Sequence, residues 1–160
     1  MTGVRIMTDR KISYMIHIAA TPEKLWAVLT DEEALKACWG IIRSAWAAGA
    51  PVEEVSSTGT VLWQGQVRHS DPPRHLSFTF DVAGIDEKPT DVSFEIEPPV
   101  SKVAPGGSIV RLKVVQSGFA ENSKLINDCA RARTEILSSI KSYVETGGAL
   151  PFAFSADVAG

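Results

Sequence analysis

The chain has 160 residues, of which 44% are hydrophobic and 22% charged, and these proportions are typical of one globular domain. Its formal net charge is −3 and it contains no basic run, which argues against a nucleic-acid partner because phosphate binding requires clustered positive charge. It also lacks an apolar run long enough for a signal peptide or a spanning helix, so a cytoplasmic protein without a membrane span is expected.

The first part of the chain predicts one strand and two short helices. Apolar and polar residues alternate over residues 11–19, which indicates a strand with one buried face. Thr21 can cap a helix and Pro22 suits its first position. Asp31 is expected to cap a second short helix that ends near Gly40.

The middle of the chain predicts strands separated by turns. Apolar residues recur at every second position over residues 60–69, 76–82, 92–96 and 110–114. Proline- and glycine-containing segments lie between these runs, and they favour turns rather than helices. The strands should therefore pair as an antiparallel sheet.

The last predicted element is a long helix that begins at Asn122 or Ser123 and ends at about Thr146, before two glycines. Its inward stripe is bulky at both ends. At mid-length it contains small or charged residues, among them Ala132 and Arg133. This helix would complete a single domain over residues 11–150, between a flexible N-terminus (1–10) and a C-terminal tail (151–160).

Motifs along nearly the whole chain agree with one known family. They are the segment 18–31, Trp39, Trp46 with Gly49, the segments 65–67 and 71–76, and the segment 136–147. They resemble the bacterial branch of the SRPBCC (START-like) superfamily that is related to the C-terminal domain of the heat-shock-protein-90 ATPase activator. The resemblance implies an α+β helix-grip fold, in which a curved antiparallel sheet wraps around a long C-terminal helix and two short helices follow the first strand.

One position departs from that family. Its members usually carry Gly-Trp in the middle of the last helix, whereas this chain has Ala132 and Arg133. A small residue and a guanidinium replace an aromatic ring that would fill the space under the helix. A cleft with its own polar chemistry is therefore predicted near Ala132.

The cleft is expected to be apolar with few polar groups. Its predicted lining is Trp63, Val67, Phe78, Phe80, Phe94, Leu112, Val114, Cys129, Ala132, Arg133 and Ile136. The alternative interpretation is that these side chains form an ordinary packed core.

Arg133 is the sharpest candidate in this set, because a buried guanidinium without a partner is costly. It could anchor a carboxylate, phenolate or carbonyl oxygen of an apolar ligand. Alternatively, it could extend to solvent or pair with a carboxylate in the core.

No catalytic residue, metal site or cofactor is predicted. His17, His69 and His75 match no metal motif, although the strand parity of His69 would allow it to act as a base at the mouth of the cleft. Cys38 and Cys129 lie outside any CxxC pattern, and Cys129 is expected to be a packing residue. The carboxylates near apolar runs, Asp81, Glu95 and Glu97, have the parity of the outer face.

The resemblance implies the binding of a small apolar molecule, such as a lipid, a polyketide or an aromatic metabolite. Two alternatives stay open: an enzyme of the polyketide cyclase or dehydratase kind, and a chaperone-interaction domain. The last ranks lowest, because the eukaryotic activators carry a further N-terminal domain that these 160 residues do not include. The apolar segment 150–154 could dock on its own domain or support a homodimer.

Overall fold

The computed structural model describes residues 10–101, 103–105 and 107–152, which form three α-helices and a seven-stranded antiparallel sheet. The elements are β1 (Arg10–Ile18), α1 (Pro22–Leu29), α2 (Glu32–Cys38), β2 (Ile41–Ser44), β3 (Pro51–Val55), β4 (Val61–Asp71), β5 (His75–Val82), β6 (Thr90–Ile96), β7 (Val110–Phe119) and α3 (Ile126–Thr146). The strand order is β1-β7-β6-β5-β4-β3-β2. The predicted α+β architecture is confirmed. Residues 1–9 of the N-terminus and 153–160 of the tail lie outside the described residues.

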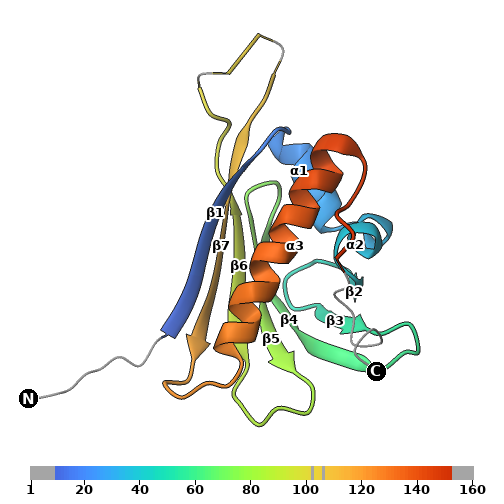
Figure 1. The fold of residues 1–160 in the computed structure, drawn as a ribbon, viewed down its shortest axis with the longest axis vertical. Coiled ribbons are helices and arrows are strands. Elements are labelled where there is room, and N and C mark those ends of the chain that lie inside the picture. The colour runs from blue at the N-terminus through green and yellow to red at the C-terminus, as the bar shows by residue number, and fades with distance from the viewer. Residues whose placement is uncertain (1–9, 102, 106, 153–160) are drawn as a thin grey trace, which may run out of the picture.

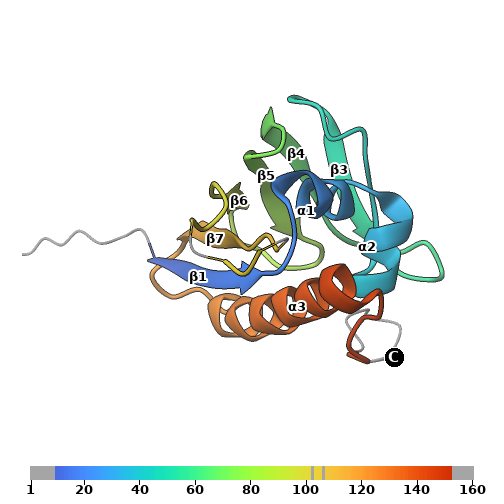
Figure 2. The same cartoon turned by 90° about the horizontal axis from the view of Figure 1, so that it is seen from above.

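The sheet curves around α3, which lies across its concave face (Figure 1). Figure 2 shows the same arrangement from above, with α1 and α2 beside the C-terminal half of α3. The apolar faces of these three helices supply much of the core.

Burial along α3 is uneven. Its C-terminal half buries Ile136, Leu137, Ile140 and Val144 against the sheet. Each such side chain contributes roughly 1.5–3 kcal/mol through the hydrophobic effect. Before Ile136 the buried residues of the helix are Cys129 and Arg133. The N-terminal half is therefore the part of the helix that fills the concave face least well.

The helix α3 begins at Ile126, later than predicted. The hydroxyl of Ser123 donates to the Glu87 carboxylate over 2.7 Å and accepts the backbone N–H of Leu125 over 3.0 Å. Glu87 also accepts the backbone N–H of Lys124 over 2.8 Å. The two bonds to Glu87, from Ser123 first and then from Lys124, lower the pKa of this carboxyl. Together with the Leu125 bond they hold Ser123 in a turn before the helix.

Two strands, β2 and β3, are not among the predicted elements. The sequence of β3 contains two consecutive glutamates, and its pairing with β4 shifts register between Glu54 and Val55. The shift interrupts the alternation from which strands are predicted. In the adjacent strand, a Cβ atom at Gly65 would collide with the backbone carbonyl of Thr79, so glycine permits the close approach of β4 and β5.

Candidate ligand-binding cleft

A cleft of about 930 Å³ lies between the sheet and the N-terminal half of α3. The helix contributes residues between Leu125 and Ile136, and β3, β4, β5 and the loop after β5 form the facing wall. Ala132 is one of the lining residues. The cleft lies where the small mid-helix residues predict incomplete filling.

The structure divides the predicted site residues into two groups. Those that line the cleft are Trp63, Phe80, Cys129, Ala132, Arg133 and Ile136. Those that are instead buried in the surrounding core are Val67, Phe78, Phe94, Leu112 and Val114. The second group has the predicted inward parity, but other core side chains cover it.

Arg133 is 3% exposed and its guanidinium is part of the cleft wall. The Nε atom donates to Oε1 of Gln116 over 3.0 Å, and Nε2 of Gln116 donates to the Thr90 hydroxyl over 2.9 Å. The guanidinium carbon lies 5.5 Å from the ring centre of Trp39 and 4.8 Å from that of Phe80. Both contacts are within the range of cation–π attraction.

The Arg133 guanidinium is incompletely satisfied. Its Nη2 atom is buried and has no hydrogen-bond partner among the described residues. Burial lowers the pKa of Arg133. The two structural alternatives for this residue are wrong: the side chain does not reach solvent, and its hydrogen-bond partner is the amide of Gln116 rather than a carboxylate. The cleft wall thus contains a buried donor without an acceptor.

The cleft also contains a buried carboxyl group, that of Glu54, which is 4% exposed. Its Oε1 atom accepts the indole N–H of Trp63 over 2.7 Å. The other oxygen, Oε2, lies so close to Gly40 that a Cβ atom there would overlap it. Burial raises the pKa of Glu54 from 4.5 to about 7, against smaller lowering effects of the Trp63 hydrogen bond, the Arg133 charge and a Trp39 hydrogen bond.

Glu54 and Arg133 influence each other through their charges, although these two described residues form no ion pair within 4.0 Å. Glu54 is absent from the predicted site because no strand is predicted over residues 51–55. A signal was present in the sequence: Val52 and Glu54 share a parity, which places Glu54 on the inward side of any strand there.

Aromatic rings form the floor of the cleft. The Trp63 ring stacks on Phe78 with a centroid distance of 5.4 Å and lies 4.6 Å from Phe80. Trp39 stacks on Trp63 with a centroid distance of 6.3 Å and also lines the cleft. These rings provide rigid apolar walls.

Cys129 is buried, and burial raises the pKa of its thiol, in agreement with a packing role.

The suggestion that His69 lies at the cleft mouth is wrong. The β4–β5 register shifts between Val67 and His69, so the parity of the strand changes at that point. The His69 ring instead bonds to Ser77 over 2.9 Å and stacks on His75 with a centroid distance of 5.2 Å. Neither histidine lines the cleft.

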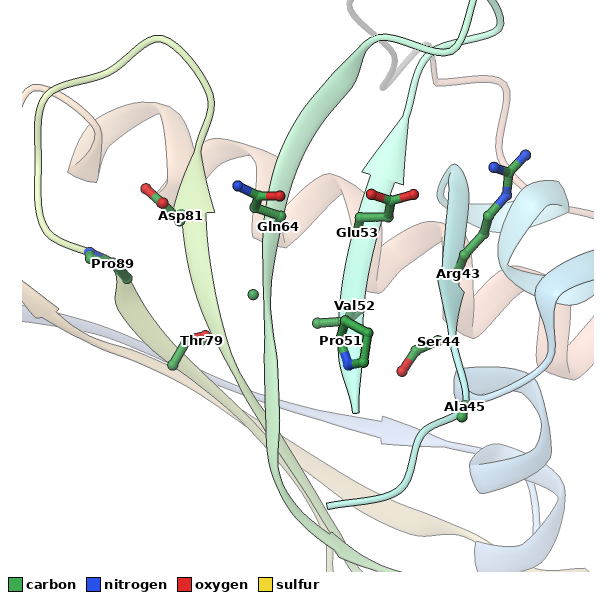
Figure 3. A pocket seen from close by; sticks show the side chains of 11 residues that line it. Arg43, Ser44, Ala45, Pro51, Val52, Glu53, Gln64, Thr79, Asp81 and Pro89 are labelled. Atoms are coloured by element: carbon green, nitrogen blue, oxygen red, sulfur yellow. The ribbon is translucent and has the colours of Figure 1, made fainter. Parts of the chain in front are cut away.

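A second hollow, of about 650 Å³, lies on the opposite face of the sheet. Figure 3 shows Arg43, Glu53, Gln64 and Asp81 in a row across four neighbouring strands, with α3 behind the sheet. None of these four described side chains is buried. The hollow therefore lacks the desolvated charge that distinguishes the inner cleft.

Two features are absent from the described residues. They contain no group of three or more His, Cys, Asp or Glu side chains that could hold a metal ion. Within the same ranges, no helix combines the length and the apolar character required to cross a membrane.

Residues 19–145 match the family described as Activator of Hsp90 ATPase homolog 1-like protein. No curated protein matches the chain significantly in sequence. This family match extends from the end of β1 to the last turn of α3 and so includes the whole cleft.

Several solved structures share the fold. The Aha1 dimer from Colwellia psychrerythraea has a TM-score of 0.67 and 23% identity, over 86% of this chain and 98% of that chain. Protein MLL2253 from Mesorhizobium loti has a TM-score of 0.68 and 22% identity, over 83% of this chain and 95% of that one. DynU16, from the dynemicin biosynthetic locus, has a TM-score of 0.70 and 16% identity, over 87% of this chain and 48% of that chain.

Proposed function

Because this chain belongs to the Activator of Hsp90 ATPase homolog 1-like family, within the SRPBCC superfamily, we propose that it binds a small amphipathic molecule between its sheet and α3. The molecule has an apolar body, such as a lipid chain, a polyketide or an aromatic ring system. Its polar end carries an oxygen that accepts a hydrogen bond from Arg133.

The unpaired Nη2 atom of Arg133 is the observation that carries this proposal. A buried charged donor without an acceptor destabilises a folded protein, typically by more than the 1–3 kcal/mol of a neutral group. A ligand oxygen at that nitrogen would form a charge-assisted hydrogen bond. Trp39, Trp63 and Phe80 surround the position with apolar surface, which suits the remainder of such a ligand.

The test begins with native mass spectrometry of freshly purified protein, followed by extraction and identification of any retained small molecule. The affinity of that molecule, or of the probe 2-naphthoate, is then measured for the wild type and for Arg133→Met. We expect at least a tenfold loss in the variant, because a hydrogen bond to a charged group contributes roughly 1.5–3 kcal/mol.

The matched control is Arg68→Met, which removes an exposed arginine of β4 outside the cleft. It should bind as the wild type does. Equal affinity of the Arg133→Met variant and the wild type would exclude Arg133 as the anchor.

A second candidate is catalysis on a carbonyl compound. A carboxyl with a pKa of about 7 in the same cleft as a buried guanidinium is an arrangement that supports proton transfer next to a polarised carbonyl. The presence of DynU16 in a biosynthetic locus is consistent with this class. Deuterium exchange at the α-carbon of a diketone probe, followed by NMR, would reveal the activity, and Glu54→Gln should abolish it.

Two further predictions concern partners. The first is a homodimer, because the apolar side chains of Leu150 and Phe152 are 38% and 43% exposed and the Colwellia protein was solved as a dimer. Sedimentation of the purified chain measures the oligomeric state. A pull-down with a heat-shock-protein-90 chaperone addresses the activity in the family's description.

A further inference from the structure

The buried part of the cleft contains one fixed positive charge and one carboxyl group. Arg133 and Glu54 are its two buried charged side chains among the described residues, and they come from α3 and β3, on opposite sides of the cleft. The other charged lining residues are Asp128, Arg131 and Glu135, which are exposed or half-exposed on α3. Asp128 and Arg131 also pair with each other over 3.3 Å. The polar chemistry of the buried part therefore depends on Arg133 and Glu54.

The carboxyl of Glu54 cannot move away from this position without losing contacts. Trp63 holds one oxygen and Gly40 packs against the other. An ionised carboxyl has about four acceptor positions, so the bonds from Trp63 and Trp39 leave capacity for a donor from a ligand. An anion bound at Arg133 would place a second negative charge in the same desolvated space, opposite a single guanidinium.

We propose that the cleft binds weak organic acids together with one proton, so that Glu54 and the acidic group of the ligand share that proton beside the fixed charge of Arg133. The proposal rests on the proposed function, and it narrows the ligand class to carboxylic acids, enols and phenols with an apolar body. Glu54 is then the residue that determines which protonation state of the ligand is accepted.

The proton has a defined source in each case. At pH 8, where Glu54 is ionised, a carboxylate takes up one proton from the buffer as it binds, and an O–H bond forms on Glu54 or on the ligand while no bond breaks in the ligand. At pH 6 Glu54 already carries that proton, so none is taken up. A phenol brings its own proton, which stays on its oxygen or passes to Glu54 with the electron pair left on the phenol oxygen. Two acidic groups that lie close together commonly retain one proton between them, because their two negative charges would repel each other.

The experiment compares 2-naphthoate with 2-naphthol, which share one ring system but differ in whether they carry a proton near neutral pH. Calorimetry in buffers of different ionisation enthalpy measures the protons taken up per ligand. For 2-naphthoate and the wild type we expect an uptake of about one proton at pH 8 and near zero at pH 6, with affinity about tenfold weaker at pH 8. For 2-naphthol at pH 8, where Glu54 is ionised and the ligand brings the shared proton, we expect no net uptake.

Variants of two adjacent residues of β3 separate the contributions. Glu54→Gln keeps an oxygen for Trp63 but carries no charge, so it should bind 2-naphthoate equally at both pH values and without proton uptake. Glu53→Gln changes the neighbouring, outward carboxyl and should retain the wild-type pH dependence.

The outcomes distinguish this inference from the proposed function. Binding of 2-naphthoate with no proton uptake and no change between pH 6 and pH 8 would overturn the shared proton and leave the ligand site intact. Failure of both probes to bind the wild type would contradict the shared proton and the proposed ligand class together. The wild-type stoichiometry is decisive even if Glu54→Gln does not fold.

Discussion

The indole N–H of Trp63 reaches the Glu54 carboxylate over 2.7 Å inside the cleft wall. This bond joins β4 to β3. It stabilises the ionised form of a carboxyl group, which burial disfavours. Through it, the protonation state of one side chain is tied to the stability of the surrounding sheet.

Removal of the Trp63 donor should destabilise the protein in a pH-dependent manner. We expect Trp63→Phe to lower the free energy of unfolding by about 1–3 kcal/mol at pH 8, where Glu54 is ionised, and by less at pH 5. Urea unfolding at both pH values measures the effect. Trp46→Phe is the control, because its ring contacts Phe78 at 6.3 Å without a bond to Glu54. Equal losses at the two pH values would contradict the assignment.

Glu54 should make the protein less stable as pH rises. Between about 4.5 and 7 the folded state holds a proton on Glu54 that the unfolded state has released, so its stabilising contribution is present below this window and lost above it. The pKa difference corresponds to roughly 3 kcal/mol in the free energy of unfolding. Relative to the wild type, Glu54→Gln should therefore gain about 2–3 kcal/mol between pH 5 and pH 8.

Denaturant titrations of the wild type, Glu54→Gln and Glu53→Gln at several pH values measure this difference. Glu53→Gln should follow the wild type, because its side chain lies on the outer face. A constant difference between Glu54→Gln and the wild type across the window would show that the folded-state pKa is close to its ordinary value.

The sequence predicted the architecture well because most strands alternate regularly and the two short helices have clear N-terminal caps. Thr21 and Asp31 accept backbone N–H bonds at the starts of α1 and α2, as expected from their positions. The small residues at the middle of α3 likewise indicated where the cleft lies.

The polar part of the cleft was only half predictable. Arg133 stands out because a charge on an apolar helical stripe is visible in the sequence. Glu54 instead lies in a five-residue strand of mixed polarity, whose alternation is interrupted by a register shift. Alternation also identified that Val67 and Phe94 point inward, but not that other core side chains cover them and separate them from the cleft. Such coverage depends on tertiary packing, which the local pattern does not contain.

Residue 40 should have to be glycine, because the Glu54 carboxyl lies against it. A methyl group at residue 40 would overlap Oε2 of Glu54, so Gly40→Ala should displace the carboxyl and destabilise the protein by about 1–3 kcal/mol. The cost should largely disappear in a Glu54→Ala background, where the overlapping atoms are absent, and a double-mutant cycle of unfolding free energies measures this coupling. Gly148→Ala is the control, because its added methyl group meets only the Thr146 hydroxyl at 3.7 Å. If the losses in unfolding free energy of Gly40→Ala and Glu54→Ala were additive, the Glu54 carboxyl would not be in contact with Gly40.

Arg133 should hold down the pKa of Glu54 even though the two side chains form no ion pair. Its positive charge favours the ionised carboxyl, so Arg133→Met should raise the pKa of Glu54 above about 7. A ¹³C NMR titration of the Glu54 carboxyl measures the change, with Arg68→Met as a control that removes a distant exposed charge. The apolar replacement also leaves Oε1 of Gln116 without its donor, so a loss of stability accompanies the shift. If the pKa of Glu54 were the same in Arg133→Met and the wild type, the two groups would titrate independently, and a ligand at one would not alter the proton on the other.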